Sequence, residues 1–314
     1  MWVNNVKTFR HFFLISSWKS SVKPLMMSTK IEFSLANYMQ RIGMATTPRA
    51  DLATLSSIMI AHSEAIAFEN IDVVLGRTVS MAESDVVKKL VDSGRGGYCF
   101  EQNTLLAMAL ESIGFDVTPV MCRVRWGKAP DDDGPNTTYT HLALKVALED
   151  GSYLADVGFA GVNSVAPVRL GTRDEQALPE GRFRIVDGTS PLPGYSVLQL
   201  LVKGEWRSVY TWRDDVFAPI VDQECSNWFS CTHPTARFTN SFFACRVVGD
   251  QRHHILNGEY VIRTGHGVDS ELESTLIRDK DALLELLEGV FNIRLGKDDM
   301  EGPLGSIDRY LPKL

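Results

Sequence analysis

The sequence contains few cysteines, and no two of them are closely spaced. Its five cysteines, at positions 99, 122, 225, 231 and 245, are odd in number and scattered, without a Cys-X-X-Cys motif. Neither a zinc ribbon nor a disulfide framework is indicated, so we expect no metal. Free thiols are typical of a reducing compartment, and a cytoplasmic location is therefore expected.

Long apolar runs and an excess of basic residues are also missing. No apolar run reaches the length of a membrane span. The chain has 32 Lys and Arg against 39 Asp and Glu, a formal net charge of −7. Because sequence-independent nucleic-acid binding needs a basic face, we expect neither nucleic acid nor a membrane as a partner. A local basic patch stays compatible with an anionic cofactor.

Acidic residues are absent from the first part of the chain. Residues 1–30 carry five Lys and Arg, and the first acidic residue is Glu32. This pattern resembles an organelle transit peptide and would indicate mitochondrial targeting. A misassigned start, with Met26 or Met27 as the true first residue, is the alternative. We treat residues 1–28 as an N-terminal extension outside the fold.

The rest of the chain changes its hydrophobic period twice, which predicts an α+β protein. Apolar residues recur at helical spacing up to Gly114, after the candidate caps Ser34, Asp51 and Ser84. From residue 115, short strands separated by Gly and Pro predict a small antiparallel barrel or sandwich. The segment from residue 222 mixes strands with one helix that begins at Asp279 or Asp281. At 314 residues, two or three subdomains are expected.

Cys99 is the candidate nucleophile. It follows Gly96-Gly97 and precedes a helical pattern that stops at Gly114. Unpaired N–H groups and the helix dipole favour a thiolate at such a helix N-terminus. A buried cysteine in a core helix is the alternative, and this stretch alone leaves both interpretations open.

His141 and Asp156 are the candidate partners of this thiol. The apolar residues of strand 140–148 share one face, so His141 points to the other. Asp156 interrupts an apolar strand, where a lone carboxylate is costly unless it is paired. A histidine bonded to a backbone carbonyl and a strand-end aspartate bonded to backbone N–H groups are the alternatives.

A hairpin closed at Asp150-Gly151 would place Asp156 opposite Lys145. His141 and Asp156 then share a face but lie four residues apart, roughly 13 Å at strand rise. Direct contact would require a bulge, a different turn or strong coiling of the barrel.

Three weaker patterns predict structural roles. Glu69 and Arg95 are expected to form a buried ion pair that fixes the Gly96-Gly97 turn. Cys225 and Cys231 lie near His233, but the spacing matches no standard zinc site, so we expect core thiols. The pair at positions 253 and 254, two adjacent histidines, is expected at the solvated surface.

Four blocks of the sequence, in this order and spacing, resemble the arylamine N-acetyltransferase family. They are Phe68-Glu69-Asn70-Ile71, Arg95-Gly96-Gly97-Tyr98-Cys99, Thr140-His141-Leu142 and Asp156-Val157-Gly158-Phe159. The resemblance runs from about residue 30 to the C-terminus. It implies a helical bundle over residues 29–114 that carries the cysteine, a β-barrel over 115–221 that carries the His and Asp, and an α/β lid over 222–314.

The resemblance also implies an activity and its residues. A Cys99–His141–Asp156 triad would transfer an acetyl group from acetyl-coenzyme A to an arylamine or hydrazine in two steps, in a monomer or weak homodimer. The family implies a substrate pocket made by Phe68, Val124 and Phe159, and coenzyme A contacts made by Thr137, Thr138, Phe229 and Thr235.

The sequence departs from the family pattern at two positions. Ala67 stands where the family often has proline, and Ala160 stands where a second glycine is usual. The added methyl group of Ala160 bears on which acyl group or amine fits. Malonyl- or propionyl-coenzyme A as the donor, a cysteine hydrolase with the same three side chains, and a thiol-based redox sensor or scaffold are the alternatives.

Overall fold

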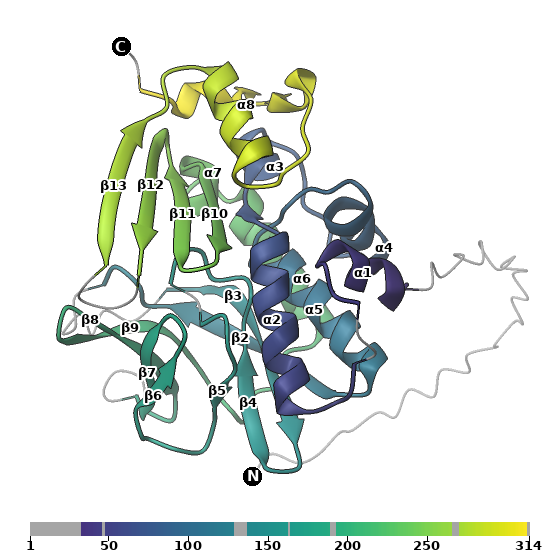
Figure 1. Ribbon diagram of the computed structural model, residues 1–314, viewed down its shortest axis with the longest axis vertical. Coiled ribbons are helices and arrows are strands. Elements are labelled where there is room, and N and C mark those ends of the chain that lie inside the picture. Colours follow the sequence, from purple (N-terminus) through teal and green to yellow (C-terminus); the bar gives the residue numbers. More distant parts are fainter. Residues whose placement is uncertain are drawn as a thin grey trace, which may run out of the picture. The chain divides into compact units, whose positions relative to one another are not determined.

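The computed structural model describes residues 33–45, 48–128, 137–162, 164–188, 193–265 and 270–312. The predicted extension at residues 1–28 lies outside these ranges. Helices predominate at the start of the described chain (Figure 1). They are α1 (Leu35–Arg41), α2 (Leu52–Ala65), α3 (Ile71–Val74), α4 (Glu83–Val87), the π-helical turn η1 (Lys88–Asp92) and α5 (Cys99–Ile113).

Side-chain caps fix where two of these helices begin, as predicted. The Ser34 hydroxyl accepts a hydrogen bond from the third residue of α1, and Asp51 accepts one at 2.8 Å from Thr54 N in α2. The predicted cap at Ser84 is wrong, because α4 begins at Glu83 and its N-cap is Ala82, two residues before Ser84. These helices pack around a core that includes Leu55.

An antiparallel sheet of eight strands follows and nearly closes into a barrel. Its strand order is β5-β4-β3-β2-β9-β8-β7-β6. The strands are β2 (Asp116–Val124), β3 (Tyr139–Leu148), β4 (Gly151–Ala155), β5 (Val168–Arg169), β6 (Gln176–Leu178), β7 (Gly181–Asp187), β8 (Ser196–Val202) and β9 (Glu205–Trp212). Gln176 of β6 bonds through its amide to both backbone groups of Arg169 in β5, which joins the two end strands.

The last part of the chain builds a second antiparallel sheet with helices. Its strand order is β1-β10-β11-β12-β13, so β1 (Phe68–Glu69), from the predicted helical bundle, belongs to this sheet. The other elements are α6 (Ile220–Thr232), α7 (Arg237–Asn240), β10 (Phe243–Val248), β11 (Gln251–Leu256), β12 (Glu259–Thr264), β13 (Glu271–Leu276), α8 (Lys280–Gly289), η3 (Lys297–Met300), β14 (Glu301–Gly302), β15 (Gly305–Ser306) and η4 (Ile307–Tyr310). Asp279 caps α8, as one of the two predicted starts. The predicted domain boundaries stay predictions.

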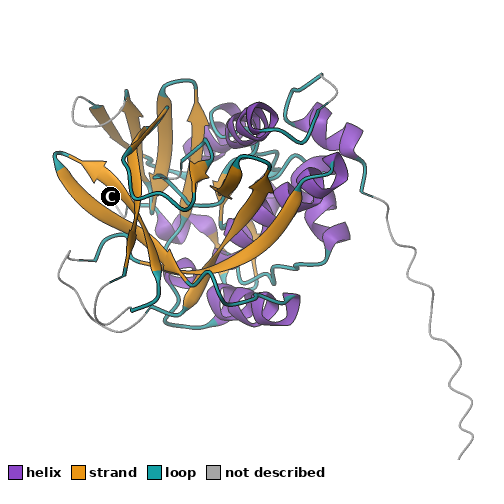
Figure 2. Cartoon of the chain, turned by 90° about the horizontal axis from the view of Figure 1, so that it is seen from below, coloured by secondary structure: helices purple, strands orange, loops and turns teal. Residues whose placement is uncertain are grey.

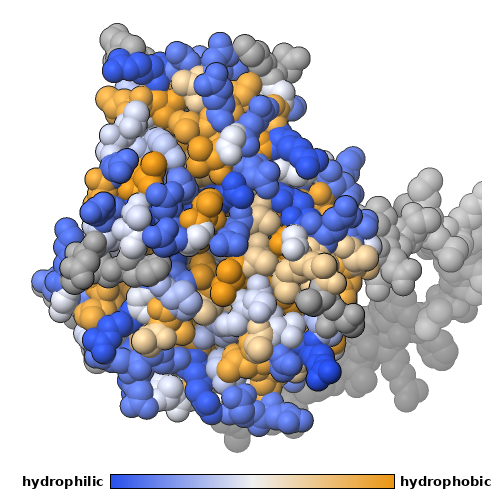
Figure 3. All heavy atoms as spheres, viewed as in Figure 1, coloured by the Kyte–Doolittle hydropathy of each residue, from blue (hydrophilic) through white to orange (hydrophobic). Residues whose placement is uncertain are grey.

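The two views show how these elements are arranged. Strands gather on one side in Figure 2 and most helices on the other, with α5 next to strands β2 and β3. Polar and apolar side chains are mixed on the face drawn in Figure 3. Among the helices of the described residues, none has both the length and the apolar character that crossing a bilayer requires.

Candidate active site

Helix α5 begins at Cys99, as the sequence predicts. The Glu101 carboxylate accepts a hydrogen bond from Tyr98 N at 3.1 Å and so caps the helix. The two glycines before Tyr98 are required by close approaches. A Cβ at Gly96 would overlap the carbonyl oxygen of Ala67, and one at Gly97 would lie 2.7 Å from Glu101 Oε2.

The predicted ion pair between Glu69 and Arg95 is confirmed. Arg95 donates to Glu69 Oε1 at 2.7 Å, and the Glu69 side chain is fully buried. The second oxygen of Glu69 accepts from Ile71 N at 2.7 Å. Both oxygens are therefore bonded, and the pair ties β1 to the residues just before the cysteine.

The hairpin between β3 and β4 corrects the predicted register. Leu148 pairs with Gly151, so Glu149 and Asp150 form the turn instead of Asp150 and Gly151. Gly151 has a φ of +145°, which a side chain rarely tolerates, and this explains why the glycine ends the turn. The predicted pairing of Asp156 with Lys145 is wrong. Continuing the observed register puts Asp156 opposite residue 143, only two residues from the histidine at 141.

His141 and Asp156 are in direct contact. Nε2 of His141 lies 2.7 Å from Asp156 Oδ2, and both residues are 2% exposed. Because Asp156 holds Nε2, the other ring nitrogen, Nδ1, is the one left for Cys99, whose side chain is near enough to help raise the pKa of His141. The cysteine is also 2% exposed, and its Sγ lies 3.6 Å from Thr140 O.

The charges of His141 and Asp156 stabilise one another. Burial lowers the pKa of His141, but the charge of Asp156 and the hydrogen bonds with Asp156 and Cys99 outweigh burial and raise it to about 10. Burial raises the pKa of Asp156, but the charge of His141 and the bonds to its carboxylate hold it below its usual value. An imidazolium paired with a carboxylate is therefore the favoured state at neutral pH.

Asn103, which the sequence analysis missed, connects α5 to this pair. It lies one turn after Cys99 and donates to Asp156 Oδ1 at 2.9 Å and to Leu142 O at 2.6 Å. Its own amide oxygen accepts from Val157 N at 3.1 Å. A polar residue four positions after the cysteine was the available signal, since residues at this spacing share a helix face.

The backbone at Gly158 brings the barrel close to the nucleophile. Gly158 N donates to Asp156 Oδ1 at 2.9 Å. A Cβ at Gly158 would lie 2.7 Å from Cys99 Cα, so a side chain there would push the helix and the barrel apart. Glycine at this position is thus a condition for the contact between Cys99 and His141.

Aromatic rings enclose the histidine. The rings of Phe159 and Tyr210 have their centroids 5.0 Å and 4.9 Å from that of His141. The two rings also contact each other at 5.4 Å. Tyr210, on β9, was not expected from the sequence, because only the pairing of β2 with β9 brings it here. Val124 of β2 lies opposite Tyr210 in that pairing.

The predicted pocket residue Phe68 also lies close to the nucleophile. It belongs to the same buried cluster as Cys99, and its ring lies 5.8 Å from that of Phe238, just after the start of α7. The ring of Phe238 also contacts Tyr98, at 5.6 Å. Residues from β1 and α7 therefore form an aromatic wall beside the cysteine.

The predicted coenzyme A contacts lie in two places. Thr137 and the exposed Thr138 precede β3, and the Thr137 hydroxyl donates to Val124 O at 2.8 Å. Phe229 lies on α6, which contacts β3, and its ring stacks on His233 at 4.5 Å. The exposed Thr235 follows α6, with its hydroxyl 2.9 Å from the same imidazole.

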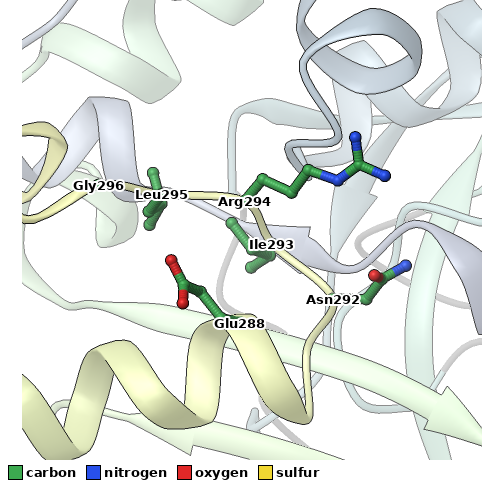
Figure 4. Close-up of a pocket in the computed structure, with 6 residues that line it drawn as sticks. All are labelled: Glu288, Asn292, Ile293, Arg294, Leu295 and Gly296. Atoms are coloured by element: carbon green, nitrogen blue, oxygen red, sulfur yellow. The ribbon is translucent and has the colours of Figure 1, made fainter.

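Two cavities in the described residues lie elsewhere. One, of about 510 Å³, is lined by Glu288 and residues 292–296; Figure 4 shows the side chain of Arg294 directed away from Glu288 there. The other, of about 580 Å³, lies beside the ion pairs of Asp72, Lys89 and Arg95. Neither includes a member of the proposed triad. The described residues hold no cluster of three or more His, Cys, Asp or Glu side chains that could bind a metal ion.

Two further structural predictions made from the sequence are wrong. His253 is buried, and burial lowers the pKa of His254 to about 3, because β11 lies inside the sheet instead of at the surface. Cys231 is a core thiol, as predicted, but Cys225 is exposed. The two cysteines lie six residues apart on α6 and so point to different sides of the helix.

A cysteine at a helix N-terminus, close to a buried histidine–aspartate pair from an antiparallel barrel, is the arrangement expected of the class of cysteine-triad proteins. Comparison with known proteins is more specific. A family model described as N-acetyltransferase matches residues 51–300. The chain is 38% identical over 224 residues to the arylamine N-acetyltransferase of Mycolicibacterium smegmatis, which covers 70% of this chain and 79% of the relative.

Other relatives match over most of their length. The arylamine N-acetyltransferase of Mycobacterium tuberculosis is 31% identical over 283 residues, 89% of this chain and 96% of the relative. The solved structure of the Mycobacterium marinum arylamine N-acetyltransferase in complex with CoA is similar with a TM-score of 0.77 at 32% identity, over 88% of this chain and 97% of that chain. The chain therefore belongs to the arylamine N-acetyltransferase family, and it is an acyltransferase enzyme. The predicted α+β fold class is confirmed.

Proposed function

We propose that the protein transfers an acetyl group from acetyl-coenzyme A to an arylamine or hydrazine through an acetyl-cysteine at Cys99. The observation that supports this most directly is the contact of Cys99 with the buried His141–Asp156 pair. The CoA complex of the M. marinum relative supports coenzyme A as the acyl carrier.

In the first step, the Cys99 thiolate attacks the thioester carbonyl of acetyl-coenzyme A. A carbon–sulfur bond forms to Cys99, the bond to the coenzyme A sulfur breaks, and the departing thiolate takes the proton of His141. Backbone N–H groups at the start of α5 stabilise the oxyanion, because a helix N-terminus presents unpaired donors. The exchange of one thioester for another is nearly balanced in energy.

In the second step, the amine nitrogen attacks the acetyl carbon. The bond to Cys99 breaks, and Nδ1 of His141 accepts the proton that the amine loses. An arylamine is weakly basic and neutral near pH 7, so its lone pair is free for attack. Phe68 and Phe159 hold the flat ring by stacking.

The binding assignments follow from the resemblance. We assign the acyl and amine pocket to Phe68, Val124 and Phe159. Coenzyme A is assigned to the surface between the start of β3 and the end of α6, with contacts from Thr137, Thr138, Phe229 and Thr235. Ala160 packs at the edge of the cluster around Cys99, so we expect its methyl group to limit the length of the acyl chain that fits.

A Cys99→Ser variant tests the nucleophile. It should fold with an unchanged circular dichroism spectrum and should lose acetyl transfer. Mass spectrometry of the wild-type protein after incubation with acetyl-coenzyme A should show one acetyl group on the Cys99 peptide. Near-normal turnover by Cys99→Ser, or a wild-type peptide without the adduct, contradicts the covalent mechanism.

Steady-state kinetics separates transfer from hydrolysis. Parallel lines in double-reciprocal plots for donor and amine are expected of a two-step transfer, whereas a cysteine hydrolase consumes the donor without the amine. Acetyl-, propionyl- and malonyl-coenzyme A should be compared with one amine, in the wild type and in Ala160→Gly. A donor preference for malonyl-coenzyme A would overturn the acetyl assignment and leave the mechanism intact.

A further inference from the structure

Gln102 is a buried polar residue near the nucleophile that the mechanism above does not use. It is 0% exposed and lies in the first turn of α5. Its amide nitrogen donates to Ala67 O at 2.8 Å and to Gly97 O at 3.2 Å. Its amide oxygen accepts from His62 Nε2 at 2.6 Å. A single side chain therefore links α5 to two backbone segments and to α2.

A chain of hydrogen bonds holds Gln102 from behind. Its amide oxygen only accepts, so His62 Nε2 must carry a proton and donate. His62 Nδ1 then accepts from the Tyr38 hydroxyl, 2.9 Å away. Burial lowers the pKa of His62 to about 4, so the ring is neutral at physiological pH and keeps this direction of donation. The amide nitrogen of Gln102 is thereby fixed toward the two carbonyl groups.

Those carbonyl groups flank the place where Phe68 meets the nucleophile loop. Phe68 and Gly97 form a parallel bridge, in which Gly97 N donates to Ala67 O at 3.3 Å and Glu69 N donates to Gly97 O at 3.0 Å. Gln102 bonds to the same two carbonyl oxygens. It thus reinforces the bridge that sets how far the Phe68 backbone lies from Cys99.

We propose that Gln102 is a positioning residue that places the wall of the acceptor pocket, through Phe68, without acting on the triad. The proposal rests on the proposed function. The triad has its own anchor, because Asn103 bonds to Asp156, to Leu142 in β3 and to Val157 just after β4. Loss of Gln102 should therefore affect an aromatic acceptor and leave acetylation of Cys99 intact.

The test compares an acceptor that has an aromatic ring with one that has none. An aniline needs the aromatic wall, whereas hydrazine itself has no ring and serves as the internal control. Gln102→Glu keeps the size of the side chain and the acceptor toward His62, but it places an oxygen against the two carbonyl groups. Gln102→Met removes both functions at similar volume. For each variant, kcat and KM are measured with both acceptors, and the rate of Cys99 acetylation is measured by mass spectrometry.

Both variants are expected to raise KM for the aniline by about tenfold, the effect of removing one hydrogen-bond donor from each of two buried carbonyl groups. Acetylation of Cys99 and the kcat/KM for hydrazine should stay within about twofold of the wild type. Equal losses with the two acceptors, or slowed acetylation, overturn the proposal. A wild-type protein that is not acetylated overturns the proposed function instead, so the two failures are distinguishable.

Tyr38→Phe keeps the proposal testable if the Gln102 variants do not fold. It removes only the hydroxyl that bonds to His62, and a smaller change, about threefold in KM for the aniline, is expected. Tyr153→Phe is the matched control, because its hydroxyl bonds at 2.7 Å to Asp150 in the β3–β4 turn. An equal effect of both substitutions on the ratio of the two acceptors, or none from Tyr38→Phe, contradicts the proposal.

Discussion

Exchanging Asp156 for asparagine tests the proposed triad at its shortest side-chain contact. Asp156→Asn keeps Oδ1, so the hydrogen bonds from Asn103 and Gly158 survive. The new amide nitrogen replaces Oδ2, where it faces Nε2 of His141. Because two donors do not bond each other, we expect the ring to carry its proton on Nδ1 and to stop accepting a proton on the side of Cys99.

The magnitude follows from the charge on His141. Burial lowers its pKa, yet Asp156 and Cys99 raise it from 6.5 to about 10. That rise corresponds to roughly 5 kcal/mol in favour of the charged ring. Without the carboxylate, burial dominates, and the pKa of His141 should fall below its usual value. The same exchange in serine proteases lowers turnover about 10⁴-fold, so we expect acetylation of Cys99 to slow by about 10³- to 10⁴-fold.

Stability should depend on pH in a matching way. Folding raises the pKa of His141, so its contribution to stability is complete below about pH 6.5, the pKa of an unfolded histidine. The contribution is lost as the pH rises to about 10. The difference in Tm between the wild type and Asp156→Asn is therefore expected to be largest at about pH 6 to 6.5 and to shrink as the pH rises toward 10.

The assay is single-turnover acetylation followed by mass spectrometry, with thermal unfolding recorded from pH 6 to pH 10. Asp187→Asn is the control, because Asp187 pairs with Arg173 at the exposed surface. The control should behave like the wild type in both measurements. Acetylation by Asp156→Asn within tenfold of the wild type, or a Tm difference that is independent of pH, would refute the reasoning.

Three further substitutions are expected to lower stability or turnover. Asn103→Ala removes the three hydrogen bonds that its amide makes to buried partners, so urea unfolding should show a loss of about 2–4 kcal/mol and turnover should fall by at least about tenfold. Gly96→Ala would press a methyl group into the carbonyl oxygen of Ala67; a Tm unchanged within error would contradict this steric account. Arg95→Met leaves the Glu69 carboxylate buried without its charge partner, at an expected cost of about 3–5 kcal/mol measured by urea unfolding.

Local patterns predicted much of the fold. The helix that begins at Cys99 and the strand that carries His141 were predicted from spacing and from turn residues, which act over a few positions. The fold class followed from the change of period at residue 115. The contact between Glu69 and Arg95, predicted as an ion pair that fixes the Gly96-Gly97 turn, is also present.

Register was the feature that local patterns did not settle. The dipeptide Asp150-Gly151 favours a two-residue turn, but Gly151 instead takes a positive φ just after a turn at residues 149 and 150. The observed register moves Asp156 two residues closer to His141 than the predicted one. This accounts for the direct contact that the predicted register did not allow. A turn type depends on the twist of both strands, which a dipeptide does not encode.

The remaining site residues depend on contacts between distant segments. Tyr210 reaches His141 only because β9 pairs with β2, and Phe238 reaches Phe68 only because β10 pairs with β1. Asn103 carried a local signal, its position one turn after Cys99, but its partners come from β3 and from the segment just after β4. Pairings of this kind are set by the packing of the whole chain, not by any single stretch of it.

The pairing of β1 with β10 has a consequence for biosynthesis. Phe68 lies beside Cys245 in the sheet, and the amide of Asn70 bonds to the carbonyl groups of Phe238 and Ser241. The ribosome makes α5 long before it makes β10, and domains fold as their residues emerge. A nascent polypeptide that ends before β10 thus contains the thiol and Phe68 but not the strand that pairs with Phe68, and we expect activity only after translation has passed residue 245.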